Sequence, residues 1–314
     1  MNLEILKKVF KGDIEQDEKT LEKYSHDASL FEVVPEVVVF PKDEADVETL
    51  VSFTKEQKKL DTKVSITPRS AGTCMSGGPL NESIILDTTK YLNNIISVDE
   101  EKAIVQPGVY YRDFEKQTLA HGSIMPAYTA SKDLCAVGGM VGNNSGGEKT
   151  IKYGKVERYV KRQRIVFSDG RTYEVKPLNK TELLAKIARE DFEGRIYKQV
   201  FDLVEQNYDL LQQAKPKVSK NSAGYYLWNV WDREKGIFDL NKLIVGSQGT
   251  LGITTEIEFS LVPVAKYSKM VVIYMSKLDK LGEVVDTVMR YEPESFESFD
   301  DYSMKLAIRF IWDF

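Results

Sequence analysis

Apolar residues follow a strand, helix, strand pattern in the first part of the chain. The continuous apolar run Val37–Phe40 predicts a buried strand. Apolar positions then recur three and four residues apart, which predicts a helix capped near Asp43. Residues 63–70 form the next predicted strand, and this order favours a small unit with parallel pairing. The apolar face of the predicted helix consists of Val47, Leu50, Val51 and Thr54.

Alternating apolar and polar residues predict strands in the middle of the chain. We expect strands on both sides of a turn at Asp99–Glu101. Residues 162–175 predict a hairpin with Asp169–Gly170 at its tip. The stretch 253–261 alternates strictly, which is typical of a half-buried strand. Its alternating set is Ile253, Thr255, Ile257, Phe259 and Leu261.

Helices are expected in three further stretches. Residues 1–32 are polar and charged and predict one or two helices. Residues 110–122 predict a helix that ends near Gly122, because glycine is common just after helix C-termini. Residues 180–215 also have helical spacing.

The pattern restarts after Pro263. We expect a strand at 270–275, a helix at 278–291, a strand at 294–300 and a helix that opens at 303, so the chain stops inside a new α/β layer. We therefore expect a fragment, or a truncated product, of a longer protein. The predicted parts are an N-terminal helical segment (1–34), a central domain (35–265) and the incomplete beginning of a further domain (266–314).

Composition narrows the classes of function. The formal net charge is −5 over 314 residues, which argues against a nucleic-acid partner. The apolar runs are too short to span a bilayer, and residues 1–13 lack the apolar core of a signal peptide. These residues resemble a short amphipathic helix, so contact with a membrane surface is a minor alternative. Cys74 and Cys135 form no disulfide framework, and we expect a cytoplasmic protein.

Three glycine-rich clusters, at 68–80, 135–147 and 246–252, are the candidate binding loops. The first lacks the Lys-Ser/Thr of a P-loop, and no G-x-G-x-x-G follows a strand as in a dinucleotide-binding fold. Successive backbone N–H groups in such loops can nevertheless cradle a phosphate or a diphosphate. Ordinary tight turns are the alternative. Hydroxyl groups that would assist the first loop belong to Ser70, Thr73 and Ser76.

Four motifs in order give the chain a family resemblance over residues 35–265. They read "ITPRSAGTCMSGG", "VQPGV", "CAVGGMVGNNSGGEKTIKYG" and "LIVGSQGTLGITTEIEFSLVP". The chain resembles the FAD-linked oxidases typified by vanillyl-alcohol oxidase, in the branch of D-lactate, glycolate and D-2-hydroxyglutarate dehydrogenases. The resemblance implies an α+β fold: a two-lobed FAD-binding domain, with a small α/β lobe and a larger, mostly antiparallel lobe, followed by the start of an α/β cap domain.

The resemblance also implies which residues contact FAD. The first loop would bind the diphosphate, the second would line the isoalloxazine and diphosphate, and the third would face the adenosine half or the ribityl chain. The implied contacts are Arg69, Ser70, Ala71, Gly72, Thr73, Cys74, Met75, Ser76, Gly77, Pro107, Gly108, Thr129, Ala130, Ser131, Val137, Gly138, Gly139, Gly142, Asn143, Asn144, Ser145, Gly147, Gly249, Gly252 and Ile253.

Two departures from the family pattern predict that FAD is held non-covalently. Relatives that attach the flavin covalently often carry a histidine where this chain has Thr73. Cys135 lies one position out of register with the flavin-linked cysteine of some relatives. We interpret Cys74 and Cys135 as small buried residues of tight loops.

Residues 217–228 resemble a segment that reaches the flavin and substrate edge in these dehydrogenases. Lys220 is a candidate for pairing with a substrate carboxylate, and Asn221 for donating to a hydroxyl or a flavin carbonyl. Tyr225 is a third candidate catalytic residue. The alternative is a helix-ending turn with core aromatic residues. Arg69 likewise has an alternative role as an ion pair.

We expect an FAD-dependent oxidoreductase that oxidises a small 2-hydroxy acid by hydride transfer to flavin N5. The alternatives are an FAD-binding module without turnover of its own, or a flavoenzyme for a sugar lactone or another alcohol. No metal site is predicted, because His26 and His121 lie in no ligand cluster. The electron acceptor stays open, and an iron–sulfur or peripheral membrane partner is an option.

Overall fold

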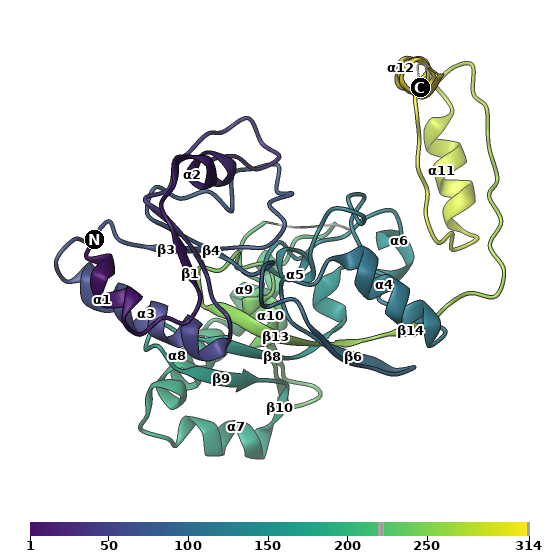
Figure 1. The fold of residues 1–314 in the computed structure, drawn as a ribbon. Coiled ribbons are helices and arrows are strands. Elements are labelled where there is room, and N and C mark those ends of the chain that lie inside the picture. Colours follow the sequence, from purple (N-terminus) through teal and green to yellow (C-terminus); the bar gives the residue numbers. More distant parts are fainter. Residues whose placement is uncertain (219–220, 222, 313–314) are drawn as a thin grey trace.

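A small lobe at the N-terminal side is built on a four-stranded sheet in the computed structural model, which describes residues 1–218, 221 and 223–312 (Figure 1). The strand order is β1-β2-β4-β3, with β2 and β3 both parallel to β4. The predicted parallel unit is therefore present, with β4 between the two strands that were expected to form it. The strands are β1 (Asp13–Glu15), β2 (Val37–Phe40), β3 (Ile66–Arg69) and β4 (Ile84–Asp87).

Helix α3 (Glu44–Lys58) covers this sheet and begins as its sequence predicts. The Asp43 side chain accepts a hydrogen bond from the backbone N–H of Asp46, which caps the helix. Val47 and Leu50 are fully buried in the core of the small lobe. The first 32 residues form two helices, α1 (Leu3–Lys7) and α2 (Glu18–Tyr24). Strand β1 between them was not predicted from the sequence.

The larger lobe is built on a five-stranded sheet in the order β5-β6-β13-β8-β9, and every pairing in it is antiparallel. The expected hairpin is present, and Gly170 at its tip has a φ of 82°. Ile257 and Phe259 are fully buried, as the alternation in β13 predicts. The strands are β5 (Ile95–Val98), β6 (Lys102–Val105), β8 (Val160–Val166), β9 (Thr172–Val175) and β13 (Ile253–Ser260).

Helices and short strands surround this sheet. Helix α4 (Tyr111–Ala120) ends where predicted, and Gly122 beyond it has a φ of 72°. The region 180–215 is helical as expected. It contains α7 (Lys180–Ile187), α8 (Phe192–Gln206) and α9 (Tyr208–Ala214). The other short elements before residue 264 are β7 (Ser123–Ile124), α5 (Val137–Gly142), α6 (Thr150–Tyr153), η1 (Val156–Arg158), β10 (Leu178–Asn179), η2 (Leu227–Asn229), β11 (Trp231–Asp232), β12 (Ile237–Phe238), α10 (Asn241–Ile244) and β14 (Val262–Pro263).

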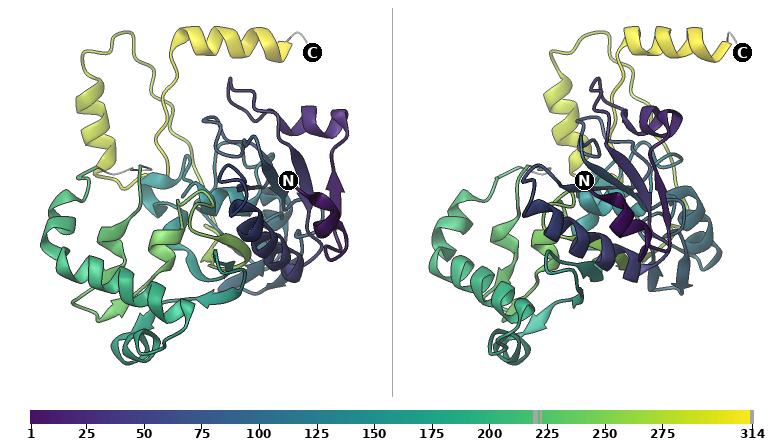
Figure 2. Two further views of the ribbon diagram at one scale, coloured as in Figure 1. Left: turned by 90° about the vertical axis from the view of Figure 1, so that its left-hand side faces the viewer. Right: turned by 60° about the vertical axis from the view of Figure 1, so that its left-hand side comes forward.

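The last part of the chain projects from the two lobes. Helices α11 (Leu281–Met289) and α12 (Asp301–Trp312) follow extended connections (Figures 1 and 2). The strands predicted at 270–275 and 294–300 are wrong, because the structure assigns no strand to either stretch. Strands need a neighbour to pair with, and Met270 and Tyr274 are instead 87% and 92% exposed.

The predicted α+β class with two lobes is confirmed. The domain boundaries that we proposed from the sequence stay predictions. Among the described residues, no helix is long and apolar enough to cross a membrane.

Candidate cofactor-binding site

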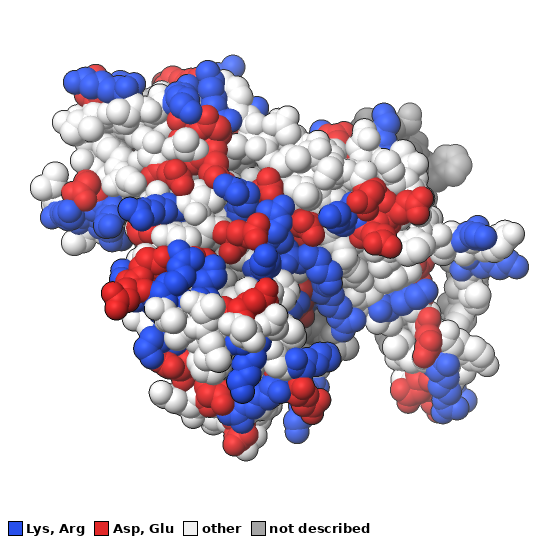
Figure 3. All heavy atoms as spheres, turned by 90° about the horizontal axis from the view of Figure 1, so that it is seen from below, with Lys and Arg blue, Asp and Glu red and all other residues white. Residues whose placement is uncertain are grey.

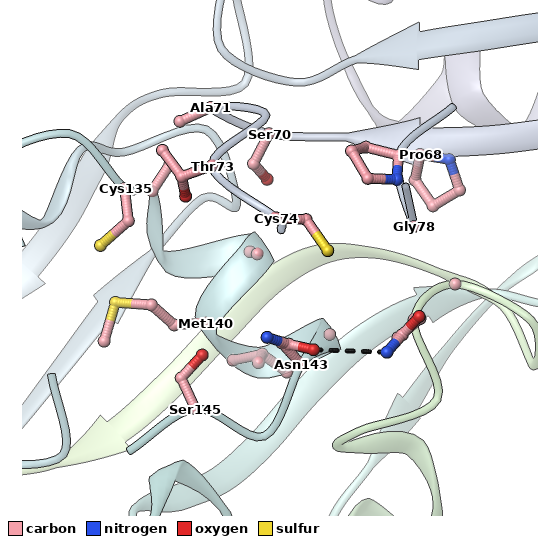
Figure 4. A pocket seen from close by; sticks show the side chains of 18 of the residues that line it. Pro68, Ser70, Ala71, Thr73, Cys74, Gly78, Cys135, Met140, Asn143 and Ser145 are labelled. Carbon is pink, nitrogen blue, oxygen red and sulfur yellow. Dashed lines mark hydrogen bonds between the residues drawn. The ribbon is translucent and has the colours of Figure 1, made fainter. Parts of the chain in front are cut away.

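A cavity of about 430 Å³ lies between the two lobes. Residues of all three glycine-rich clusters line it, including Pro68 from β3, together with Thr254 from β13. Figure 4 shows side chains of the first loop facing those of α5 and the residues after it across this space. The three clusters, far apart in the sequence, therefore meet at one site.

Helix α5 is held against the first loop by its glycines. The backbone N–H of Gly138 donates to the carbonyl of Pro107 at 2.8 Å. A Cβ added to Gly138 would lie 2.6 Å from Pro107 Cβ and 2.8 Å from Ser70 Oγ, so only glycine fits this contact. A Cβ added to Gly139 would meet nothing closer than Ser70 Cβ at 3.8 Å. Gly138 therefore serves the packing of the protein, whereas Gly139 opens onto the cavity.

The third loop is fastened to the end of α5. The N–H groups of Gly246 and Gln248 donate to the carbonyls of Val141 and Gly142, each at 2.9 Å. Gln248 Nε2 also donates to Asn143 Oδ1 at 3.3 Å (Figure 4). These bonds fix the third loop as one wall of the cavity.

The described lining of the cavity is uncharged. No Lys, Arg, His, Asp or Glu stands among the described residues that line the cavity. Its polar groups are backbone amides, hydroxyls such as those of Ser70 and Thr73, and the side-chain amides of Asn143 and Gln248. The face of the molecule in Figure 3, by contrast, carries intermixed positive and negative side chains. A bound anion would thus be received by neutral N–H and O–H dipoles.

Most of the predicted contacts line this cavity. They are Ser70, Ala71, Gly72, Thr73, Cys74, Met75, Ser76, Pro107, Thr129, Ser131, Gly138, Gly139, Gly142, Asn143, Ser145, Gly249 and Gly252.

Eight predicted contacts do not line it: Arg69, Gly77, Gly108, Ala130, Val137, Asn144, Gly147 and Ile253.

Arg69 and Gly77 instead connect the first loop to the N-terminal segment. The Arg69 guanidinium donates to the carbonyls of Tyr24 at 3.2 Å and His26 at 2.7 Å. The N–H of Gly77 donates to the Asp27 carboxylate at 3.0 Å. These hydrogen bonds join Arg69 to backbone carbonyls rather than to a carboxylate, and its contact with FAD stays a prediction.

Sequence reasoning missed several lining residues. The third glycine cluster contained the signal for two of them, Ser247 and Gln248. The first two clusters contained the signal for most of the others. Only Ile244 and Thr254 lie outside the clusters, and they line the cavity because distant elements meet there. The residues missed are Pro68, Pro79, Cys135, Ala136, Ile244, Ser247, Gln248 and Thr254, whereas Gly78, Met140 and Val141 also line the cavity and belong to the loops that the resemblance implied.

Of the candidates from residues 217–228, Asn221 and Tyr225 are not among the residues that line the cavity. Lys220 is outside the described residues. The Tyr225 hydroxyl is 2.7 Å from Thr250 Oγ1, and the Asn221 carbonyl accepts from Lys155 Nζ and the Tyr226 hydroxyl. The buried Lys155 was not singled out from the sequence, and burial raises the pKa of Tyr226 to about 12.

The two cysteines differ in exposure. Cys135 is buried, as expected, and burial raises the pKa of its thiol, while Thr129 Oγ1 lies 3.4 Å from its sulfur. Cys74 is only partly buried, so that prediction was wrong for it, because its side chain borders the open cavity. No cluster of three or more potential metal ligands occurs in the described part of the chain.

The structure defines a protein of two lobes with a cavity lined by glycine loops between them, and comparison with known proteins identifies the cofactor. Residues 35–176 match the model of the FAD binding domain family. Residues 35–176 are thus similar to FAD binding domains, and the resemblance of the chain to FAD-linked 2-hydroxy-acid dehydrogenases is confirmed.

Curated relatives support the same branch. The chain is 28% identical over 307 residues to a D-2-hydroxyglutarate dehydrogenase of Pseudomonas putida, covering 96% of this chain and 30% of the relative. It is 26% identical to the glycolate oxidase subunit GlcD of Bacillus subtilis, covering 86% of this chain and 48% of that protein. A D-lactate dehydrogenase of Archaeoglobus fulgidus is 24% identical, with coverages of 86% and 49%. The chain thus spans about a third to a half of the length of these relatives.

A solved structure shares the fold. An alkyldihydroxyacetonephosphate synthase superposes with a TM-score of 0.58 at 20% identity, covering 84% of this chain and 40% of that one. At this identity the match shows the architecture alone.

Proposed function

We propose that this chain is the FAD-binding part of an oxidoreductase that oxidises a small 2-hydroxy acid. The observation that carries the proposal is the cavity where the three glycine loops meet, whose described lining includes no charged side chain. The names of the relatives, which include dehydrogenases of D-2-hydroxyglutarate and D-lactate, support the substrate class.

The residues present fit FAD without a covalent link. The open space beside Gly139 leaves room for a flat ring system or a diphosphate against the helix backbone. The first loop and the hydroxyl of Ser145 offer donors for phosphate oxygens. No histidine lines the described cavity, and Thr73 stands in the first loop, so we propose non-covalent binding. When bound, FAD supplies the acceptor for the hydride that leaves the substrate carbon.

The protein's own residues would bind, orient and keep water away from the reacting groups. The proton of the substrate hydroxyl needs an acceptor with a suitable pKa, for which histidine is the usual choice. Among the described residues, His26 lies beside Glu32 and His121 caps α4. Neither lines the cavity. Lys220 and Asn221 remain the proposed contacts for a substrate carboxylate and hydroxyl.

The test separates cofactor binding from turnover. We expect the purified chain to bind FAD, and to reduce no dye with D-lactate, glycolate or D-2-hydroxyglutarate. The product of the whole reading frame serves as the comparison. Failure to bind FAD would refute the proposal. Robust dye reduction by the 314-residue chain would place the proton acceptor within it and make Lys220 and Tyr225 the first residues to substitute.

A further inference from the structure

A network of hydrogen-bonded polar side chains runs from the interior of the larger lobe to the cavity. Thr254 of β13 lines the cavity, and its Oγ1 donates to Gln163 Oε1 at 3.0 Å. Gln163 Nε2 donates in turn to Asn241 Oδ1 at 3.1 Å. Gln163 is 0% exposed and Asn241 is 1% exposed. This network of side chains thus has one end in the core and the other at the candidate site.

Asn241, at the core end of this network, determines how the side-chain amide of Gln163 and the hydroxyl of Thr254 are oriented. Asn241 Nδ2 donates to the carbonyl of Lys161 at 3.4 Å, which leaves Asn241 Oδ1 as the acceptor for Gln163 Nε2. Because the amide nitrogen of Gln163 is committed to Asn241, its oxygen faces Thr254. The Thr254 hydroxyl must therefore give its single proton to Gln163. What it offers to a ligand is a lone pair, so it acts as an acceptor.

Packing alone does not call for these residues. Burying an amide costs free energy unless its groups are paired, and apolar residues fill neighbouring inward positions of the same strand, such as Val160 and Ile165. An apolar pair at positions 163 and 254 would fill the sheet without that cost. The polar pair instead fixes the orientation of the hydroxyl group of a residue that lines the cavity.

We propose that Thr254, oriented by Gln163 and Asn241, selects an N–H donor on one of the two ring systems of FAD. The proposal rests on FAD being the ligand of this cavity. Two N–H groups of FAD fit this role, the exocyclic amine of adenine and the N3–H of the flavin ring. Thr254 is then a specificity-determining contact, while Gln163 and Asn241 are positioning residues.

The first experiment compares FAD affinity in three variants. Thr254→Val removes the acceptor with little change in shape and should weaken FAD binding about tenfold, the effect of leaving one buried donor unpaired. Thr254→Ser keeps the hydroxyl and should restore the affinity. Thr255→Val is the matched control, because Thr255 lies next to it on the strand, is buried, bonds to Glu44 at 2.8 Å and does not line the cavity. It should lower thermal stability without changing FAD affinity.

The second experiment measures selectivity, which a purely structural role would not change. Flavin hypoxanthine dinucleotide presents a carbonyl where adenine presents its amine, and N3-methyl FAD lacks the flavin N–H. The unaltered chain should bind one of these analogues about tenfold more weakly than FAD. Gln163→Met frees the Thr254 hydroxyl to donate, so that this preference should collapse.

Two results would overturn the proposal: equal FAD affinity for the unaltered chain and Thr254→Val, or no preference against either analogue in the unaltered chain. Absence of any FAD binding by the unaltered chain would refute the proposed function itself, and would be recognised before any variant is compared.

Discussion

Replacing Gly139 with valine tests whether the cavity holds the flavin cofactor against the backbone of α5. In the structure, a Cβ at this position lies 3.8 Å from Ser70 Cβ, an ordinary van der Waals separation. Valine is also a slightly better helix former than glycine, by a few tenths of a kcal/mol. The free energy of unfolding of the cofactor-free protein should therefore change by less than about 0.5 kcal/mol.

Binding should respond differently, because the new side chain enters the space that the cofactor needs. Overpacking a tight contact costs about 1–3 kcal/mol, which corresponds to roughly 5- to 150-fold weaker binding. The variant should lose most or all of its yellow colour during purification. FAD affinity is measured by quenching of flavin fluorescence, and stability by thermal unfolding of the cofactor-free protein.

Gly282→Val is the matched control, since Gly282 lies in helix α11 with open space around its Cβ position. It should leave both stability and FAD affinity unchanged. Full FAD content in Gly139→Val would refute the reasoning and make the second glycine cluster an ordinary turn. A large loss of stability in that variant would also count against it, because the space beside Gly139 would then be needed by the protein itself.

Three further predictions use other features of the structure. Gly138→Ala should destabilise the fold by about 1–3 kcal/mol in thermal or urea unfolding, because its Cβ would lie 2.7 Å from the Pro107 carbonyl oxygen; unchanged stability would mean that α5 does not pack as described. Acid precipitation of the FAD-loaded chain should release all flavin into the supernatant, and colour in the pellet would reveal a covalent link. Burial raises the pKa of Asp239, so the folded state holds its proton to a higher pH than the unfolded state and stability should fall as pH rises through that window. Asp239→Asn should remove this part of the pH dependence in unfolding curves, and an unaltered profile would contradict the assignment.

The sequence predicted the elements whose signal is local. Strand β2 is a continuous apolar run, α3 has a capping aspartate, and the hairpin of β8 and β9 has Asp169–Gly170 at its tip. The prediction of a strand at 270–275 was wrong because a strand forms only beside a partner strand, and the described part of the chain provides none there. Strand β1 was missed for the opposite reason, since its three residues become a strand only by pairing with β2.

The same distinction applies to the candidate site. Glycine clusters reveal flexible or closely approached backbone wherever they occur, so the three loops were visible in the sequence. Gly108 belongs to such a motif, yet a Cβ there would lie 2.0 Å from the Thr88 carbonyl oxygen, so its role is contact within the protein. Thr254 and Gln163 carry no local signal, because their meaning comes from the pairing of β13 with β8.

The bonds of the first loop to residues 24–28 bear on how the chain can be shortened for study. The backbone N–H of Ala28 donates to the Cys74 carbonyl at 3.1 Å, in addition to the contacts that Arg69 and Gly77 make. An expression product that starts at residue 35 would keep every glycine of the loop and lose all of these anchors. The FAD affinity measured for such a product would be that of a loop without its anchors. Shortened versions of this protein should therefore retain the first 34 residues, even though the sequence pattern alone marks them as a separate segment.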